Sequence, residues 1–175
     1  MKPESIKIKQ ASLADAPFLT ALVNSAYRGE SSKAGWTTEA DLLDGIRVDQ
    51  EKIIELISQK NSYILKAVEG DKIIGCVHLD KHNEKCYLGM LTVSPTLQNS
   101  GLGKKLLLAS EKFAQEQMQC SKVYMNVISI RQELILWYVR RGYHLTGEIK
   151  PFPMEDPRFG IPKTKLEFLI LQKNL

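Results

Sequence analysis

The chain has 175 residues, of which 43% are apolar and 25% are charged, and its formal net charge is +4. We expect a single domain over 1–175, because domains commonly contain about 100–200 residues, and the mild charge without a basic, aromatic-rich run argues against a nucleic acid partner. No apolar stretch approaches the roughly 20 residues of a membrane helix, and Met1–Ser5 begin no apolar signal segment, so we expect no membrane contact and a cytoplasmic location.

The first third of the chain predicts one strand followed by three helices. Residues 5–9 alternate polar and apolar side chains, which is typical of a half-buried strand. Ser12, with Asp15 three residues later, is a capping candidate for the first helix. Thr38 and Asp49 are capping candidates for two shorter helices.

The periodicity then changes from helix to strand. Strands are predicted over 63–68, 72–79 and 87–93, separated by turns at Gly70-Asp71 and Asn83-Glu84. Because the connections are short, the three strands are expected to form an antiparallel meander. His78 falls inside the second strand and is expected in the core or on the sheet surface, while Cys76, Cys86 and Cys120 are expected as buried or half-buried free thiols.

The last third predicts an amphipathic helix after Gly103, a strand over 123–128, a helix over 134–141 and closing strands over 143–149 and 166–171. A strand, a helix and a further strand in succession imply a right-handed parallel crossover. The sequence therefore predicts an α/β fold, with a mixed sheet and helices on both faces.

The segment Gln98–Gly103 lies between a strand and the amphipathic helix and contains two glycines. Free backbone N–H groups at a helix start bind anions, and residues without a Cβ allow phosphate oxygens to approach closely. Lys104 and Lys105 place positive charge in the first turn, where the helix dipole disfavours it unless an anion is bound. The alternative is an ordinary glycine turn, and neither common nucleotide-binding glycine pattern is present.

Two motifs together give the chain a family resemblance. Gln98-x-x-Gly101-x-Gly103, directly after Leu91–Pro95, resembles the acyl-coenzyme A signature of the GNAT superfamily of N-acetyltransferases. Trp137-Tyr138, followed by Gly142-Tyr143, is similar to the later helix motif of that family. The resemblance implies a sheet of about seven strands, with an antiparallel N-terminal meander and a splayed parallel pair.

The resemblance also implies that acetyl-coenzyme A is the co-substrate. Its pantetheine arm would lie along the splayed strand at Leu91, Thr92 and Val93, near Trp137. Its pyrophosphate would be held by backbone N–H groups of the turn, which are those of Gln98, Asn99, Ser100, Gly101, Leu102, Gly103 and Lys104.

Tyr138 is the predicted catalytic acid. A hydroxyl of pKa about 10 can hydrogen-bond or protonate a leaving thiolate of pKa about 8.5. The alternative is a packing aromatic residue at helical spacing. No general base is evident, because Tyr87 stands where some members of the family carry a glutamate; Glu30, Glu39 and Glu84 are the alternatives, each of which also fits a surface charge.

Two segments, 27–39 and 150–162, are expected to form the acceptor wall, and Tyr27, Glu30, Trp36 and Phe152 are the predicted acceptor-binding residues. The prolines of the second segment argue against regular structure there. Docking of the first segment against the core, and a structural or dimer-contact role for the second, are the alternatives.

The expected function is transfer of an acetyl group to a small-molecule amine or amino acid. A protein N-terminus or lysine is an alternative acceptor, and an acyl-coenzyme A-binding regulatory module without catalysis is an alternative function. The sequence leaves open the acceptor, the acyl chain, the pathway and the oligomeric state, including a homodimer.

Overall fold

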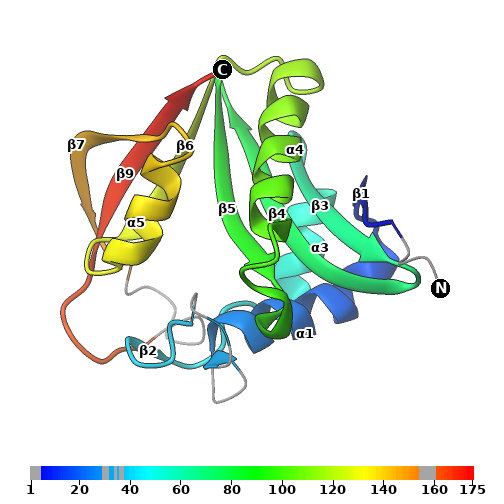
Figure 1. Cartoon of the computed structure of the whole chain (residues 1–175), viewed down its shortest axis with the longest axis horizontal. Helices are drawn as coiled ribbons and strands as arrows, with labels where there is room; N and C mark the ends of the chain where they lie inside the picture. The colour runs from blue at the N-terminus through cyan, green and yellow to red at the C-terminus, as the bar shows by residue number, and fades with distance from the viewer. Residues whose placement is uncertain (1–4, 29–31, 34, 36–37, 154–160) are drawn as a thin grey trace.

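The computed structural model describes residues 5–28, 32–33, 35, 38–153 and 161–175. Its main sheet has seven strands in the order β1-β3-β4-β5-β6-β9-β7 (Figure 1). Their bounds are β1 (Lys7–Gln10), β3 (Ser62–Glu69), β4 (Lys72–His82), β5 (Lys85–Val93), β6 (Lys122–Ile128), β9 (Glu167–Asn174) and β7 (His144–Pro151). A second sheet pairs β2 (Leu43–Asp44) with β8 (Ile161–Pro162).

Helices cover both faces of the main sheet, as the sequence predicts. They are α1 (Ala16–Tyr27), α3 (Gln50–Ser58), α4 (Leu102–Glu116) and α5 (Gln132–Val139), with short 3-10 turns at Leu13–Asp15 and Pro95–Leu97. Successive strand residues point to opposite faces, so Ile64 packs in the core under α1 and α3, while Leu65 packs in the core under α4 and α5. The predicted mixed α/β fold is confirmed.

Two predicted helix starts are confirmed by their hydrogen bonds. The Asp15 carboxylate accepts from the Ser12 backbone N–H at 2.8 Å, within a capping box. The Asp49 carboxylate accepts from the Lys52 backbone N–H at 2.8 Å. All three cysteines are free and buried, as expected.

The predicted helix after Thr38 is wrong. Residues 40–42 form a turn, and Leu43–Asp44 form β2. The backbone N–H of Glu39 donates to the Tyr27 carbonyl, and the Leu43 side chain is buried in a cluster with Ile128 and Leu166. These contacts across the chain override the local capping pattern.

The prediction that segment 150–162 lacks regular structure is wrong at both of its ends, where strand residues occur. Pro151 ends β7, and Pro162 ends β8. Both positions tolerate a missing N–H, because β7 is the edge strand of its sheet and β8 has only two residues.

The parallel strands β5 and β6 are paired over only a short length and then diverge. Their register covers only Lys85–Tyr87 against Lys122–Tyr124, although β5 continues to Val93. In Figure 1 the two strands meet near the C-terminus and diverge below it. The predicted splayed pair is therefore present.

A β-bulge interrupts β5 where it has left β6. On β4, Cys76 pairs with Thr92 and His78 pairs with Gly89, so Val77 faces the two residues between them. One of those residues, Met90, has a φ of 54°. A bulge of this kind bends the strand and redirects neighbouring groups.

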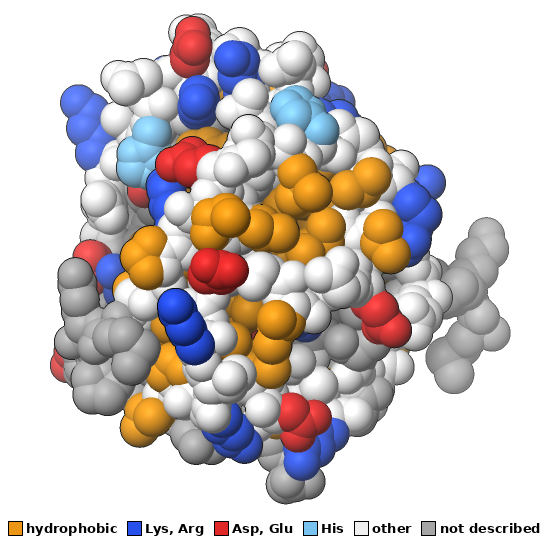
Figure 2. Space-filling view, turned by 90° about the vertical axis from the view of Figure 1, so that its left-hand side faces the viewer, with side chains coloured by type: hydrophobic (Ala, Val, Ile, Leu, Met, Phe, Trp, Pro, Cys, Tyr) orange, Lys and Arg blue, Asp and Glu red, His pale blue; other side chains and the backbone are white. Residues whose placement is uncertain are grey.

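Figure 2 shows the face on which β7 lies, where apolar side chains gather. Leu145 and Ile149 of β7 are 51% and 57% exposed. Apolar side chains on a sheet edge are typical of a contact surface, and the homodimer that the sequence leaves open stays a prediction. Along the described part of the chain, none of the helices has the length and apolarity needed to cross a bilayer.

The core under α4 supplies a matched pair of substitutions. Leu106 is 0% exposed and Leu108 is 54% exposed on the same helix. We expect Leu106→Ala to lower the free energy of unfolding by about 2–5 kcal/mol, through lost burial and the cavity left behind. Leu108→Ala should change it by less than about 1 kcal/mol. Urea unfolding followed by circular dichroism measures both, and equal losses would contradict this core assignment.

His78 makes the stability of the fold depend on pH. It is 6% exposed and hydrogen-bonded to the Ser62 hydroxyl at 2.8 Å. Burial, together with the charges of Arg47 and Lys52, lowers its pKa from 6.5 to about 4, against an opposing effect of Asp80. The unfolded chain therefore binds more protons between these two pKa values, so the free energy of unfolding falls as pH falls.

Between pH 7 and pH 5 we expect the buried histidine to lower the free energy of unfolding by about 2 kcal/mol. The drop should shrink in His78→Gln and persist in His82→Gln, because the His82 side chain is 54% exposed. Urea unfolding at the two pH values measures the difference. An identical pH dependence in His78→Gln and the wild type would refute this assignment.

Candidate functional site

Two cavities border the part of β5 that lies beyond its pairing with β6. The larger one has a volume of about 610 Å³ and the smaller one about 410 Å³. Four residues line both cavities, namely Tyr27, Leu91, Leu134 and Tyr138. The cavities therefore meet at these residues, which we call the junction.

The smaller cavity gathers most of the predicted cofactor residues. Those that line it are Leu91, Val93, Gln98, Asn99, Gly101, Gly103, Lys104 and Trp137. The other three lie beside it. The Thr92 hydroxyl donates to the Met90 carbonyl, the Ser100 hydroxyl donates to the Leu97 carbonyl at 2.5 Å, and Leu102 is buried in the core.

The turn before α4 has the geometry of an anion site. Gly101 has a φ of 85° and precedes the first residue of a 15-residue helix. Free N–H groups of the first helical turn and the helix dipole both favour an anion at this end. A Cβ at Gly101 would meet no atom within 4 Å, so the reason for glycine here is its left-handed backbone.

Positive side chains border the same cavity. Lys104 comes from α4, and Arg140 and Arg141 follow α5. The Arg141 guanidinium lies 3.8 Å from the centre of the Trp137 ring, and its Nη1 donates to the Trp137 carbonyl at 2.8 Å. No carboxylate is among the described residues that line this cavity. Both arginines were missed from the sequence as cofactor-site residues, although they lie between Trp137-Tyr138 and Gly142-Tyr143 in the second motif.

The Gln98 side chain holds the turn against neighbouring segments. Its side-chain amide donates to the Val93 carbonyl at 3.2 Å. It also packs so closely on Gly35 that a Cβ there would lie 2.4 Å from the Gln98 side-chain oxygen. The turn, the end of β5 and the segment after α1 are therefore fixed to one another.

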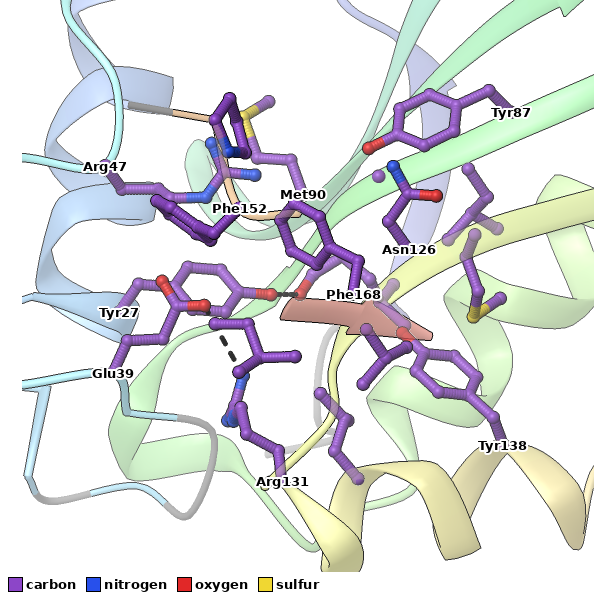
Figure 3. Close-up of a pocket in the computed structure, with 18 of the residues that line it drawn as sticks. Tyr27, Glu39, Arg47, Tyr87, Met90, Asn126, Arg131, Tyr138, Phe152 and Phe168 are labelled. Carbon is purple, nitrogen blue, oxygen red and sulfur yellow. Dashed lines mark hydrogen bonds and ion pairs between the residues drawn. The ribbon is translucent and has the colours of Figure 1, made fainter. Parts of the chain in front are cut away.

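Two tyrosines define the junction. The Tyr27 hydroxyl donates to the Leu91 carbonyl, beside the bulge in β5. Burial raises the pKa of Tyr27 to about 12 and raises that of Tyr138 above its ordinary value, so both hydroxyls stay protonated at neutral pH. Figure 3 shows the Tyr138 hydroxyl directed toward the middle of the larger cavity.

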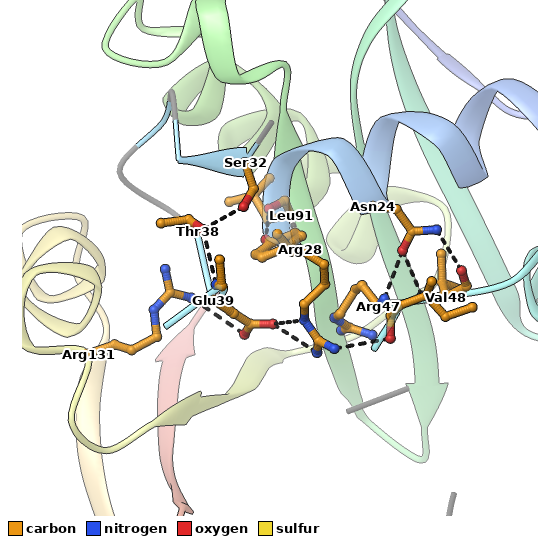
Figure 4. A network of polar contacts seen from close by, with 12 residues as sticks. Asn24, Arg28, Ser32, Thr38, Glu39, Arg47, Val48, Leu91 and Arg131 are labelled. Atoms are coloured by element: carbon orange, nitrogen blue, oxygen red, sulfur yellow. Dashed lines mark hydrogen bonds and ion pairs between the residues drawn. The ribbon is translucent and has the colours of Figure 1, made fainter. Parts of the chain in front are cut away.

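The larger cavity contains a buried ion-pair network. One Glu39 oxygen lies 3.1 Å from the Arg28 guanidinium, and the other lies 3.7 Å from that of Arg131 (Figure 4). Arg28 and Glu39 are 6% and 8% exposed. Protonation of Glu39 would leave two buried cations without their counter-charge, so Glu39 fits a structural role better than that of a general base.

Neither Tyr87 nor Glu84 has the properties of a general base. Tyr87, which stands in place of the family glutamate, lines the larger cavity, but burial raises the pKa of its hydroxyl, which therefore stays protonated at neutral pH and cannot take up a proton. Glu84 sits in the turn before β5 and is absent from the described linings of both cavities. Glu30 lies outside the described residues.

Two of the four predicted acceptor-binding residues are among the described residues. Tyr27 and Phe152 line the larger cavity, and the Phe152 ring lies 5.2 Å from that of Phe168. Trp36, like Glu30, lies outside the described residues. The sequence reasoning missed Asn126, whose buried side-chain oxygen has no hydrogen-bond partner in the described part of the chain. Nothing local in the sequence marks this asparagine as a cavity residue.

The chain is similar to known acetyltransferases. The acetyltransferase (GNAT) family profile matches residues 21–143. Spermine/spermidine N(1)-acetyltransferase of Bacillus subtilis is 29% identical over 70 residues, which are 40% of this chain and 46% of that protein. The chain therefore aligns with less than half the length of this curated relative.

Solved structures share the fold over nearly the whole chain. The ribosomal-protein-S18-alanine N-acetyltransferase of Escherichia coli has a TM-score of 0.72 at 13% identity, covering 97% of this chain and 94% of that one. The PaiA N-acetyltransferase of Thermoplasma acidophilum, solved in complex with coenzyme A, has a TM-score of 0.69 at 18% identity, covering 98% and 99%. With the family profile over most of its length, the splayed strands and the glycine turn in place, the chain belongs to the GNAT acetyltransferase family.

Proposed function

We propose that the protein is an N-acetyltransferase that transfers the acetyl group of acetyl-coenzyme A to an amine by direct attack. The observation that carries the proposal is the meeting of two cavities at Tyr138 and Leu91. One has an anion-binding turn and cationic walls, as a coenzyme A site requires. The other has both polar and apolar walls and opens onto the same tyrosine.

The smaller cavity is the proposed donor site. The pyrophosphate of coenzyme A would lie at the turn before α4, near Lys104 and Arg141. The pantetheine arm would run along β5, whose backbone beyond Tyr87 is not paired with β6. Unpaired strand groups need partners, and the amides of pantetheine supply them. The thioester would then lie at the junction.

The reaction needs few groups from the protein. The amine nitrogen attacks the thioester carbonyl carbon, the carbon–nitrogen bond forms, and the carbon–sulfur bond breaks. The Tyr138 hydroxyl gives its proton to the leaving thiolate and regains a proton from water, which takes up the proton that the amine nitrogen releases. The unpaired Asn126 oxygen is suited to accept a hydrogen bond from the amine.

The cost of deprotonation favours an acceptor of low pKa. At pH 7, a lysine-like amine of pKa about 10.4 costs roughly 4.6 kcal/mol to deprotonate, whereas an α-amine of pKa about 8 costs roughly 1.4 kcal/mol. Glu39 is the one carboxylate among the described residues of the larger cavity, and two arginines hold it. An α-amino group therefore suits this site better than a more basic amine.

We favour a small-molecule acceptor in the cytoplasm over a protein N-terminus or lysine, because Phe152 and Pro153 help to enclose the larger cavity. The similarity to the spermine/spermidine enzyme supports an amine acceptor of some kind. An acyl-coenzyme A-binding module without catalysis is the competing function. It predicts tight coenzyme A binding with no acetylation of any amine.

Removal of the Tyr138 hydroxyl tests the acid. We expect Tyr138→Phe to lower kcat by about 100-fold or more, as loss of a general acid does. The Kd for acetyl-coenzyme A should change little. Tyr63→Phe is the control, because the Tyr63 ring packs on Phe113 and is absent from the described lining of either cavity. A thiol-release assay measures both variants, and unchanged turnover in Tyr138→Phe would rule out this role.

A matched pair of glycines tests the donor site. Gly101 and Gly147 have φ values of 85° and 86°, and a Cβ would meet nothing within 4 Å at either position. A left-handed valine costs about 1–2 kcal/mol, so both variants should lose similar stability.

Only Gly101→Val should weaken coenzyme A binding in calorimetry, because a side chain there would stand in the way of the phosphate oxygens that approach the turn. We expect Kd to rise by about tenfold or more, which corresponds to about 1.4 kcal/mol of binding free energy. Gly147→Val should bind as the wild type does, because Gly147 lies in β7, away from the turn. Equal affinities of the two variants would show that the pyrophosphate binds elsewhere.

A further inference from the structure

A third cavity, of about 190 Å³, opens from the larger one. It is lined by Arg47, Val48, Lys52, Leu56, His78, Tyr87, Gly89 and Met90. Five of these residues also line the larger cavity, among them Arg47, Lys52 and Tyr87. The third cavity is therefore a branch of the proposed acceptor site, and we call it the side chamber.

The side chamber is cationic. Arg47 and Lys52 are its charged residues, and no carboxylate is among its described lining. His78 adds no charge at neutral pH, because burial lowers its pKa to about 4. The charge of the chamber therefore differs from that of the rest of the acceptor cavity, where Glu39 balances Arg28 and Arg131.

Arg47 has a guanidinium without an ion-pair partner in the described part of the chain. Its guanidinium carbon lies 5.9 Å from the centre of the Tyr27 ring (Figure 3). Lys52 pairs with Glu55 at 3.2 Å, where both side chains are 42% or more exposed. Exposed pairs of this kind are weak, so Lys52 is also able to turn toward an anion in the chamber.

The backbone that carries Arg47 is held on both sides. The Asn24 side-chain oxygen accepts from the Arg47 and Val48 N–H groups at 2.8 and 3.1 Å, and its amide donates to the Val48 carbonyl at 2.8 Å (Figure 4). The Arg28 Nη1 donates to the Ile46 carbonyl at 3.0 Å. A fixed backbone lowers the entropy cost of using the side chain to bind a ligand.

We propose that the acceptor amine carries an anionic group, which binds in the side chamber between Arg47 and Lys52 while the amine reaches the junction. This inference rests on the proposed acetyltransferase function. Because Arg47 lies against Tyr27, and Tyr27 contacts Leu91 at the junction, the anion and the amine must be close together in the molecule, as they are in an α-amino acid. A polyamine would place further positive charge beside two cations.

The test compares matched amines. A panel of amino acids is assayed against the corresponding amines without the carboxylate, together with aminophosphonates and spermidine. We expect kcat/KM to favour the anionic member of a pair by about 10- to 100-fold, the range of a charge-assisted hydrogen bond. The aminophosphonates distinguish a phosphate-type anion from a carboxylate.

Arg47→Gln should raise KM for the anionic acceptors, leave their kcat nearly unchanged and remove most of the preference. The kcat/KM for the uncharged analogues should change much less than that for the anionic acceptors, and the Kd for acetyl-coenzyme A should stay as in the wild type, because Arg47 is absent from the described lining of the smaller cavity. Lys72→Gln is the control, because it removes the same charge from an exposed position. Arg47→Lys should recover part of the preference. If Arg47→Gln folds poorly, Lys52→Gln is assayed in its place, and it should also lower the preference for anionic acceptors.

Two failures are distinguishable. Acetylation of amines with equal kcat/KM for both members of each pair, or with a preference for spermidine, would overturn the side-chamber assignment and leave the proposed function standing. Tight acetyl-coenzyme A binding with no acetylation of any amine would reject the proposed function and this inference together.

Discussion

The parting of β5 from β6 after Tyr87 is the constraint on which the rest of the site depends. It leaves strand backbone without its neighbouring strand, and such groups need other partners. The bulge at Met90 bends β5 at this place, and the Tyr27 hydroxyl donates a hydrogen bond to the Leu91 carbonyl. The opening between the strands is thereby stabilised from inside the fold, and both large cavities border it.

The two proposed sites differ in charge. The proposed donor site combines a helix start with Lys104, Arg140 and Arg141. In the proposed acceptor site, Arg28 and Arg131 form ion pairs with Glu39, which joins the segment after α1 to the start of α5. This network fixes the walls of the cavity, and Arg47 and Lys52 are the other cations in its described lining.

The fold was largely predictable because its signals are local. Hydrophobic period and turn residues mark the strands and helices. The glycine turn marks the smaller cavity, and Tyr138 marks the junction of the two cavities. The features that were not predicted depend on contacts between distant segments. Leu43 is buried against residues more than 80 positions away, and this burial overrides the helix start predicted at Thr38. The position of Arg47 depends on the hydrogen bond from its backbone N–H to the Asn24 side chain. Contacts between distant segments leave no periodic trace in one sequence.

We propose that the donor and acceptor sites meet at Tyr138 and Leu91, and a crystal structure of the protein with a bound acetyl-coenzyme A analogue would show whether they do. Pyrophosphate density is expected at the turn before α4, and the thioester carbonyl is expected within hydrogen-bond distance of the β5 backbone at Leu91, with its sulfur near the Tyr138 hydroxyl. A pyrophosphate bound away from Gly101–Lys104, or a thioester directed away from the larger cavity, would contradict this proposal.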